Sequence, residues 1–99
     1  MSHRYYSEIN LHLVWHTRDS RPLLTPAVEA AAHGALRQRV LGTPGVRLHA
    51  LNGTDNHVHL AVSIPPTLRI SDFVGDVKGA SSHALNQMFA RDGECFAWQ

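Results

Sequence analysis

The sequence predicts a single α+β domain in which an antiparallel sheet carries two helices on one face. Three segments alternate apolar and polar residues with the period of two that is typical of strands. Two longer segments repeat apolar residues at the three- and four-residue intervals of a helix. The length of 99 residues and a hydrophobic fraction of 43% fit one globular core and exclude a two-domain enzyme.

The first strand is predicted over residues 9–16, where apolar side chains form one face and the other face contains His12 and His16. The first helix is predicted from Pro26 to about Leu41. A threonine that can cap the helix precedes this proline, and proline fits the first helical position. Glycine and proline follow the last apolar residue of the helical stripe and predict its end.

Two short strands over residues 46–52 and 57–64 are predicted to pair as an antiparallel hairpin, because four turn-forming residues separate them. Ser71 is expected to cap a second helix that continues to Phe89. The terminal residues Glu94, Cys95, Phe96, Ala97 and Trp98 predict the beginning of a fourth strand. The resulting order, β-α-β-β-α-β, is that of a ferredoxin-like sandwich, in which one sheet face stays open.

Composition limits the class of protein without identifying its function. A formal net charge of +1 permits nucleic-acid binding but does not predict it. The single cysteine excludes an internal disulfide. The apolar runs are far shorter than the roughly 20 residues that span a bilayer, so we expect a cytoplasmic protein with no membrane partner.

Histidines are the most unusual feature of the composition, with eight in the chain. His57 and His59 lie two residues apart in a predicted strand, so both side chains project from the polar face. Such a pair can bind one divalent ion when a further ligand completes the site, and it can equally be part of an ordinary polar sheet face. His12, His16 and His49 are expected to be solvated or nucleic-acid-facing side chains rather than metal ligands.

Four motifs in the correct order resemble those of the single-tyrosine HUH transposases, the family that includes the REP-associated tyrosine transposases. The main motif is DNHVHLAV at residues 55–62, which two prolines follow closely. The other three are HLVWHTR at residues 12–18, VKGASS at residues 77–82 and FAWQ at residues 96–99. The resemblance therefore covers essentially the whole chain.

This resemblance implies a DNA transposase domain in which His57 and His59 bind Mg²⁺ or Mn²⁺. A tyrosine then attacks the scissile phosphate of single-stranded or hairpin DNA, and the protein acts as a homodimer. Family members place that tyrosine and a third metal ligand on a helix after the fourth strand. Tyr5 and Tyr6 precede the first strand, so neither is assigned as the nucleophile. We therefore expect residues 1–99 to be one transposase-like domain without the tyrosine-bearing helix, catalytically inactive by itself and with weak or absent metal binding.

Basic residues supply the expected DNA contacts, which are Arg18, Arg21, Arg47 and Lys78. Two alternatives to a transposase remain open at this level. One is a module that binds DNA hairpins without cutting them. The other is an oligomeric ferredoxin-like module with no nucleic-acid role, because this fold serves many unrelated functions.

Overall fold

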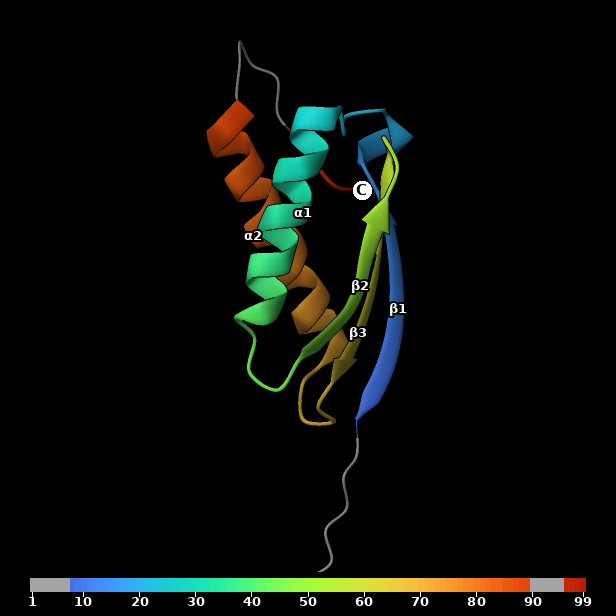
Figure 1. The fold of residues 1–99 in the computed structure, drawn as a ribbon, viewed down its shortest axis with the longest axis vertical. Coiled ribbons are helices and arrows are strands. Elements are labelled where there is room, and N and C mark those ends of the chain that lie inside the picture. The colour runs from blue at the N-terminus through green and yellow to red at the C-terminus, as the bar shows by residue number, and fades with distance from the viewer. Residues whose placement is uncertain (1–7, 90–95) are drawn as a thin grey trace, which may run out of the picture.

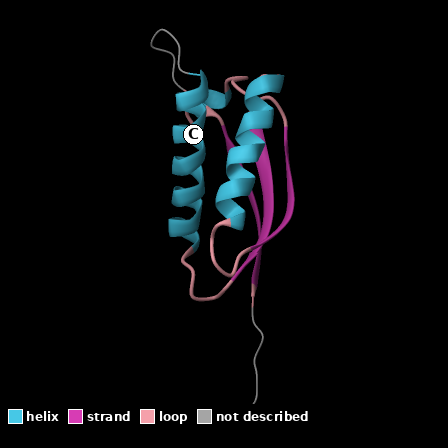
Figure 2. Ribbon diagram, turned by 60° about the vertical axis from the view of Figure 1, so that its left-hand side comes forward, coloured by secondary structure: helices cyan, strands magenta, loops and turns pink. Residues whose placement is uncertain are grey.

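A computed structural model describes residues 8–89 and 96–99 of the chain. Three antiparallel strands form a sheet in the order β1-β3-β2, and two helices pack against one of its faces (Figures 1 and 2). A short 3-10 helix, Arg18–Ser20, follows the first strand. The main elements are β1 (Ile9–His16), α1 (Pro26–Leu41), β2 (Arg47–Gly53), β3 (His57–Ile64) and α2 (Ile70–Phe89).

The predicted α+β class and the single helix-covered face are confirmed, and the predicted fourth strand lies partly outside the described residues. Within residues 96–99 the sheet continues as one isolated antiparallel bridge, between Thr17 and Trp98. The backbone N–H of Gln99 donates to the carbonyl of His16 at 2.7 Å. This segment therefore lies beside the end of β1. Residues 94 and 95 of the predicted strand lie outside the described residues.

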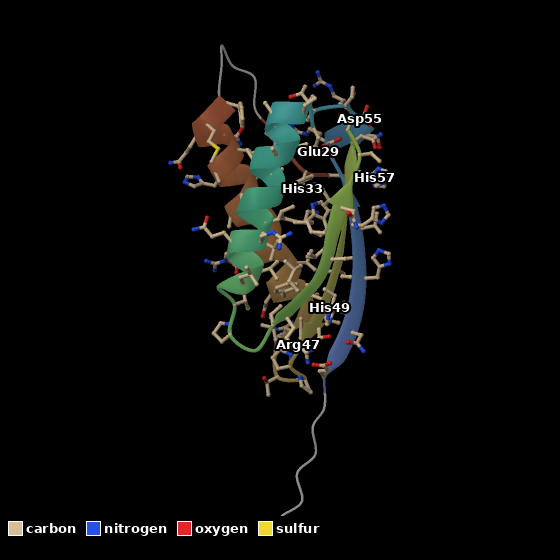
Figure 3. The ribbon with its side chains drawn as sticks, in the orientation of Figure 1. Glu29, His33, Arg47, His49, Asp55 and His57 are labelled. Atoms are coloured by element: carbon tan, nitrogen blue, oxygen red, sulfur yellow. The ribbon has the colours of Figure 1, made fainter. Side chains whose placement is uncertain are left out.

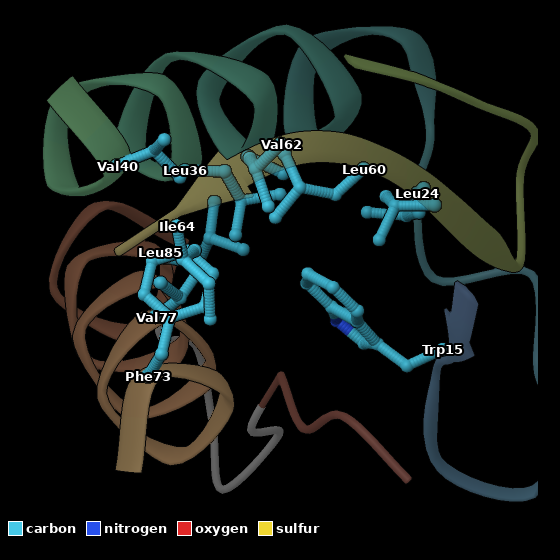
Figure 4. Packing of buried hydrophobic residues seen from close by; sticks show 12 residues of the cluster. Trp15, Leu24, Leu36, Val40, Leu60, Val62, Ile64, Phe73, Val77 and Leu85 are labelled. Carbon is cyan, nitrogen blue, oxygen red and sulfur yellow. The ribbon is translucent and has the colours of Figure 1, made fainter. Parts of the chain in front are cut away.

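The core fills the space between the helices and the inner face of the sheet (Figure 4). Four side chains of β3 point inward and are at most 1% exposed, as the alternation predicts. On α2 the buried residues recur every fourth position, and the buried Ser81 is one of them. Met88 shares the three- and four-residue spacing of this stripe but is 62% exposed, so the pattern alone overestimates its burial. The core comprises Trp15, Leu24, Ala32, Leu36, Val40, Val58, Leu60, Val62, Ile64, Phe73, Val77 and Leu85.

A β-bulge interrupts the regular pairing of β2. Leu48 and Leu51 both pack against the core, yet they are three residues apart, and a regular strand would place them on opposite faces. The register shifts between Leu48 and Ala50, which makes His49 the extra residue. The bulge therefore lets both leucines face inward.

Both helix starts differ in detail from the prediction. Thr25 occupies the N-cap position of α1, but its hydroxyl makes no capping hydrogen bond. Instead, its carbonyl accepts the N–H of Glu29 at 2.7 Å. α2 begins at Ile70, so Ser71 lies inside the first turn and is not the cap. Within residues 8–89 and 96–99, no helix combines the length and the hydropathy needed to cross a bilayer.

Candidate metal and nucleic-acid site

Four histidines form a continuous row on the open face of the sheet. His16 is the direct cross-strand partner of His57, and the ring centroids of this pair are 5.2 Å apart. The ring centroids of His57 and His59 are 4.9 Å apart, because the two residues lie on the same face of one strand. His12 continues the row, with its ring 5.5 Å from that of His59. The predicted histidine pair is therefore on the uncovered face, with His12 and His16 beside it.

His57 is held on one side of its ring by two residues that precede it. Its Nδ1 lies 2.8 Å from Asn56 Oδ1 and 2.8 Å from Thr54 Oγ1. The Thr54 hydroxyl also donates to Asn56 Oδ1 at 3.2 Å. The other ring nitrogen of His57, Nε2, makes no hydrogen bond within the described residues. The turn of the hairpin therefore fixes one nitrogen of this histidine and leaves the other available to a ligand.

The loop that follows β1 packs against this turn. Asn56 Nδ2 donates to the carbonyl of Ser20 at 3.3 Å, and the N–H of Leu24 donates to the carbonyl of Asp55 at 2.9 Å. Asp19 and Ser20 both have positive φ, 54° and 55°, in a region that few residues other than glycine occupy. The strained backbone of this loop is thus next to the candidate site.

The buried Thr17 joins the end of β1 to the same turn. Its backbone N–H donates to the carbonyl of Asn56 at 2.9 Å. Its hydroxyl donates to the carbonyl of Arg21 at 2.5 Å and also lies 3.2 Å from the carbonyl of Asn56. Its side chain is 0% exposed, so water cannot replace these contacts.

Replacing Thr17 with valine is expected to lower the free energy of unfolding by about 1–3 kcal/mol, because the buried Thr17 side chain loses its hydrogen bonds to the carbonyls of Arg21 and Asn56. The change keeps the side-chain volume, so packing is preserved. Urea denaturation measures the loss, and Thr17→Ser, which keeps the hydroxyl, serves as the control. Equal stability of the valine and serine variants would contradict a role for the hydrogen bonds.

The basic residues predicted to contact DNA do not all lie together. Arg18 and Arg21 are exposed on the loop packed against the hairpin turn, close to the histidine row. The ammonium of Lys78 on α2 donates a hydrogen bond to the carbonyl of Gln99 at 2.7 Å, and the backbone N–H of Gln99 donates to the carbonyl of His16. Arg47 pairs with Ser63, six residues along β3 from His57 and about 20 Å away at 3.3 Å per residue.

Arg47 also has a partner of its own, since its guanidinium lies 3.5 Å from the carboxylate of Glu8. Figure 3 shows Arg47 and His49 well down the hairpin from His57 and Asp55. The structure therefore brings Arg18, Arg21 and Lys78 to the histidine end and leaves Arg47 at the other.

Residues 96–99 are anchored to both α2 and β1. Asn86 makes two hydrogen bonds with the backbone of Phe96, at 3.0 and 2.6 Å. The indole of Trp98 donates to Ser81 Oγ at 2.9 Å, and the amide oxygen of Gln99 accepts the N–H of Asp19 at 2.8 Å. Phe96 and Trp98 are partly buried and pack against the core rather than forming an exposed stacking platform.

His49 belongs to a different cluster from the other open-face histidines. Its Nε2 lies 2.5 Å from Ser63 Oγ, and this hydroxyl donates to Asn10 Oδ1 at 2.5 Å. Ser63 is almost fully buried although it is on the open face, because these two side chains cover it. His49 thus lies beside Ser63, four residues along β3 from His59 and six from His57.

The donor set around His57 and His59 fits part of a metal site. Two imidazoles on one face supply two nitrogen ligands, and the hydrogen bonds at His57 Nδ1 are of the kind that orient metal-bound histidines. Among residues 8–89 and 96–99, no group of three or more histidine, cysteine or acidic residues is arranged to hold an ion. The histidines fit a cation whose remaining positions are filled by water or by phosphate oxygens.

Comparison with known proteins identifies the family and agrees with the fold. A family model described as "Transposase IS200 like" matches residues 5–99. The ISDra2 transposase TnpA of Deinococcus radiodurans is 28% identical over 81 residues, which are 82% of this chain and 57% of that protein. The chain thus spans little more than half of that relative.

A crystal structure of a candidate transposase from the same organism superposes with a TM-score of 0.68 and 26% identity. The superposition covers 90% of this chain and 68% of the chain in that crystal structure. The family model accounts for nearly all of the residues, including all four motifs, and the resemblance inferred from those motifs is confirmed. The chain belongs to the IS200-like transposase family.

Proposed function

We propose that this chain is the part of a transposase that binds single-stranded or hairpin DNA across the open sheet face, with His57 and His59 holding Mg²⁺ or Mn²⁺ against a DNA phosphate. The observation that carries the proposal is the adjacency of these two imidazoles on the uncovered face, with ring centroids 4.9 Å apart. Both residues lie in the motif by which the chain resembles its family.

The chemistry of the donors favours Mn²⁺ over Mg²⁺. Mg²⁺ prefers oxygen ligands and strict octahedral geometry, whereas imidazole suits the later divalent metals better. A cation bound here would offset the negative charge of a phosphodiester and so make it easier to attack. The chain's own contribution is to hold two nitrogen ligands on a rigid central strand, since β3 is hydrogen-bonded to β1 on one side and to β2 on the other.

The neighbouring cations favour DNA as the ligand. Arg18 and Arg21 are exposed on a loop that is hydrogen-bonded to the turn before His57. Guanidinium groups there can bind the backbone phosphates on either side of the one at the metal. Lys78 and Arg47 remain proposed DNA contacts, but we expect them to contribute less to affinity than the loop arginines. Lys78 is already hydrogen-bonded to Gln99, and Arg47 lies at the far end of the hairpin.

The metal part of the proposal is tested by calorimetry with Mn²⁺. The wild-type chain is expected to release binding heat that disappears in the variant His57→Ala/His59→Ala. His83→Ala, which removes an exposed histidine on α2, is the matched control and is expected to bind like wild type. Identical Mn²⁺ heats in the wild type and the double variant would reject the site.

The DNA part is tested by fluorescence anisotropy with a labelled DNA hairpin at several salt concentrations. Affinity is expected to fall steeply with salt, because each phosphate contact releases counterions. Arg18→Ala/Arg21→Ala is expected to reduce the slope of log K against log salt by about 2, roughly one for each lost phosphate contact. Arg37→Ala, on the exposed side of α1, is the control and should leave the slope unchanged. A slope unaffected by the loop arginines would contradict the proposed DNA path.

Cleavage and rejoining of DNA by a tyrosine belongs to the proposal for the whole protein. The motifs matched in these residues assign no tyrosine, and Tyr5 and Tyr6 lie outside the described residues. Association into a homodimer likewise stays a prediction. Sedimentation is expected to show self-association, and a monomer at high micromolar concentration would contradict it.

A further inference from the structure

The Asn56 side chain contacts both the candidate metal ligand His57 and the arginine-bearing loop. Its Oδ1 lies 2.8 Å from His57 Nδ1, and its Nδ2 donates to the carbonyl of Ser20 at 3.3 Å. Its backbone carbonyl accepts the N–H of Thr17 at 2.9 Å. The main chain and the side chain of Asn56 are therefore both held in place.

These contacts determine which way the Asn56 amide faces. The Ser20 carbonyl can only accept a hydrogen bond, so the group opposite it must be the amide nitrogen. The amide oxygen then faces His57, and the opposite orientation would place two carbonyl oxygens against each other. The Thr54 hydroxyl, which donates to the same Oδ1 at 3.2 Å, supports this orientation.

An amide oxygen facing His57 Nδ1 determines where the imidazole carries its proton. Oδ1 has no hydrogen to donate, so the 2.8 Å contact is a hydrogen bond only when Nδ1 is protonated. A neutral imidazole with its proton on Nδ1 has its lone pair on Nε2, the nitrogen that makes no hydrogen bond within the described residues. The tautomer that Asn56 favours is therefore the one that binds a cation through Nε2.

We propose that Asn56 is a positioning residue that fixes His57 in the Nδ1–H tautomer and so presents Nε2 to the divalent cation. The role in metal binding rests on the proposed function. The preference of His57 for the Nδ1–H tautomer does not, because Asn56 imposes it without a metal. Thr54 cannot replace Asn56 in this role. Its hydroxyl, also 2.8 Å from Nδ1, accepts from Nδ1–H while it donates to Asn56 Oδ1; without that oxygen the hydroxyl can instead donate to a bare Nδ1 and selects neither tautomer.

The tautomer is measured by NMR of the imidazole nitrogens in the ¹⁵N-labelled chain without metal, at alkaline pH. Wild-type His57 is expected as the Nδ1–H tautomer. The exposed His83 gives the internal reference for a histidine in water, which favours Nε2–H. Asn56→Ala is expected to move His57 toward the pattern of His83. Asn56→Asp, which keeps an acceptor oxygen beside Nδ1, is expected to retain the wild-type tautomer.

The same variants are then titrated with Mn²⁺. Asn56→Ala is expected to weaken binding by about 10- to 100-fold, the usual effect of removing the partner of a metal-bound histidine. Asn56→Asp is expected to restore most of it. A wild-type His57 protonated on Nε2, or an alanine variant with an unchanged tautomer, overturns the positioning role. If wild-type His57 has the expected tautomer but the chain binds no Mn²⁺, the positioning role of Asn56 is supported and the metal site is rejected.

Discussion

Replacing Phe73 with alanine is expected to lower the free energy of unfolding by about 3–5 kcal/mol. Phe73 is 2% exposed in the first turns of α2 and belongs to the core between the helices and the sheet. Removing its ring loses the transfer free energy of the buried carbons and leaves a cavity that the neighbouring side chains cannot fill. A domain of this size has a total stability of about 5–15 kcal/mol, so the variant loses much of what it has.

Urea denaturation followed by circular dichroism measures this loss. Met88→Ala is the matched control, because Met88 is on the same helix but 62% exposed, and its change is expected to stay within about 0.5 kcal/mol. Phe73→Leu keeps most of the apolar volume and provides a folded intermediate case if the alanine variant fails to fold. A similar loss in the Phe73→Ala and Met88→Ala variants would contradict the assigned core.

The two strands of the histidine row could be predicted from the sequence because their alternation alone fixes which residues share a face. β3 keeps a strict period of two, and its inward side chains are almost wholly buried. The adjacency of His57 and His59 follows from the same period. β2 could not be predicted in detail, since the bulge at His49 depends on how Leu48 and Leu51 meet the core in three dimensions.

The supports of the site could not be predicted, because they come from contacts between distant parts of the chain. Asn56 meets Ser20 across 36 residues and Thr17 across 39. The sequence signals available were an asparagine directly before the first histidine and a threonine two residues earlier, and neither residue type alone identifies such a role. The position of Trp98 has the same cause, since it depends on a bridge to the distant Thr17.

Replacing Gly53 with alanine is expected to destabilise the domain by about 2–3 kcal/mol, within the range for overpacking a close contact. A Cβ at this position would lie 2.5 Å from the carbonyl oxygen of His57 and 3.2 Å from the Cα of Val58. Both neighbours are backbone atoms of β3, so relief requires the paired strands to separate or slide. Glycine is therefore required here by the close approach of the two strands.

The same substitution is expected to weaken Mn²⁺ binding, because the strained contact is with His57 itself. Gly34→Ala is the matched control, since a Cβ there meets nothing within 4 Å in α1 and should stabilise the chain by about 0.5–1 kcal/mol. Calorimetry on the folded fraction of each variant separates the two effects. Weaker Mn²⁺ binding in Gly53→Ala, with unchanged binding in Gly34→Ala, would link the geometry of the hairpin to the metal ligand. Unchanged binding in a destabilised Gly53→Ala would show that the strands separate without moving the imidazole.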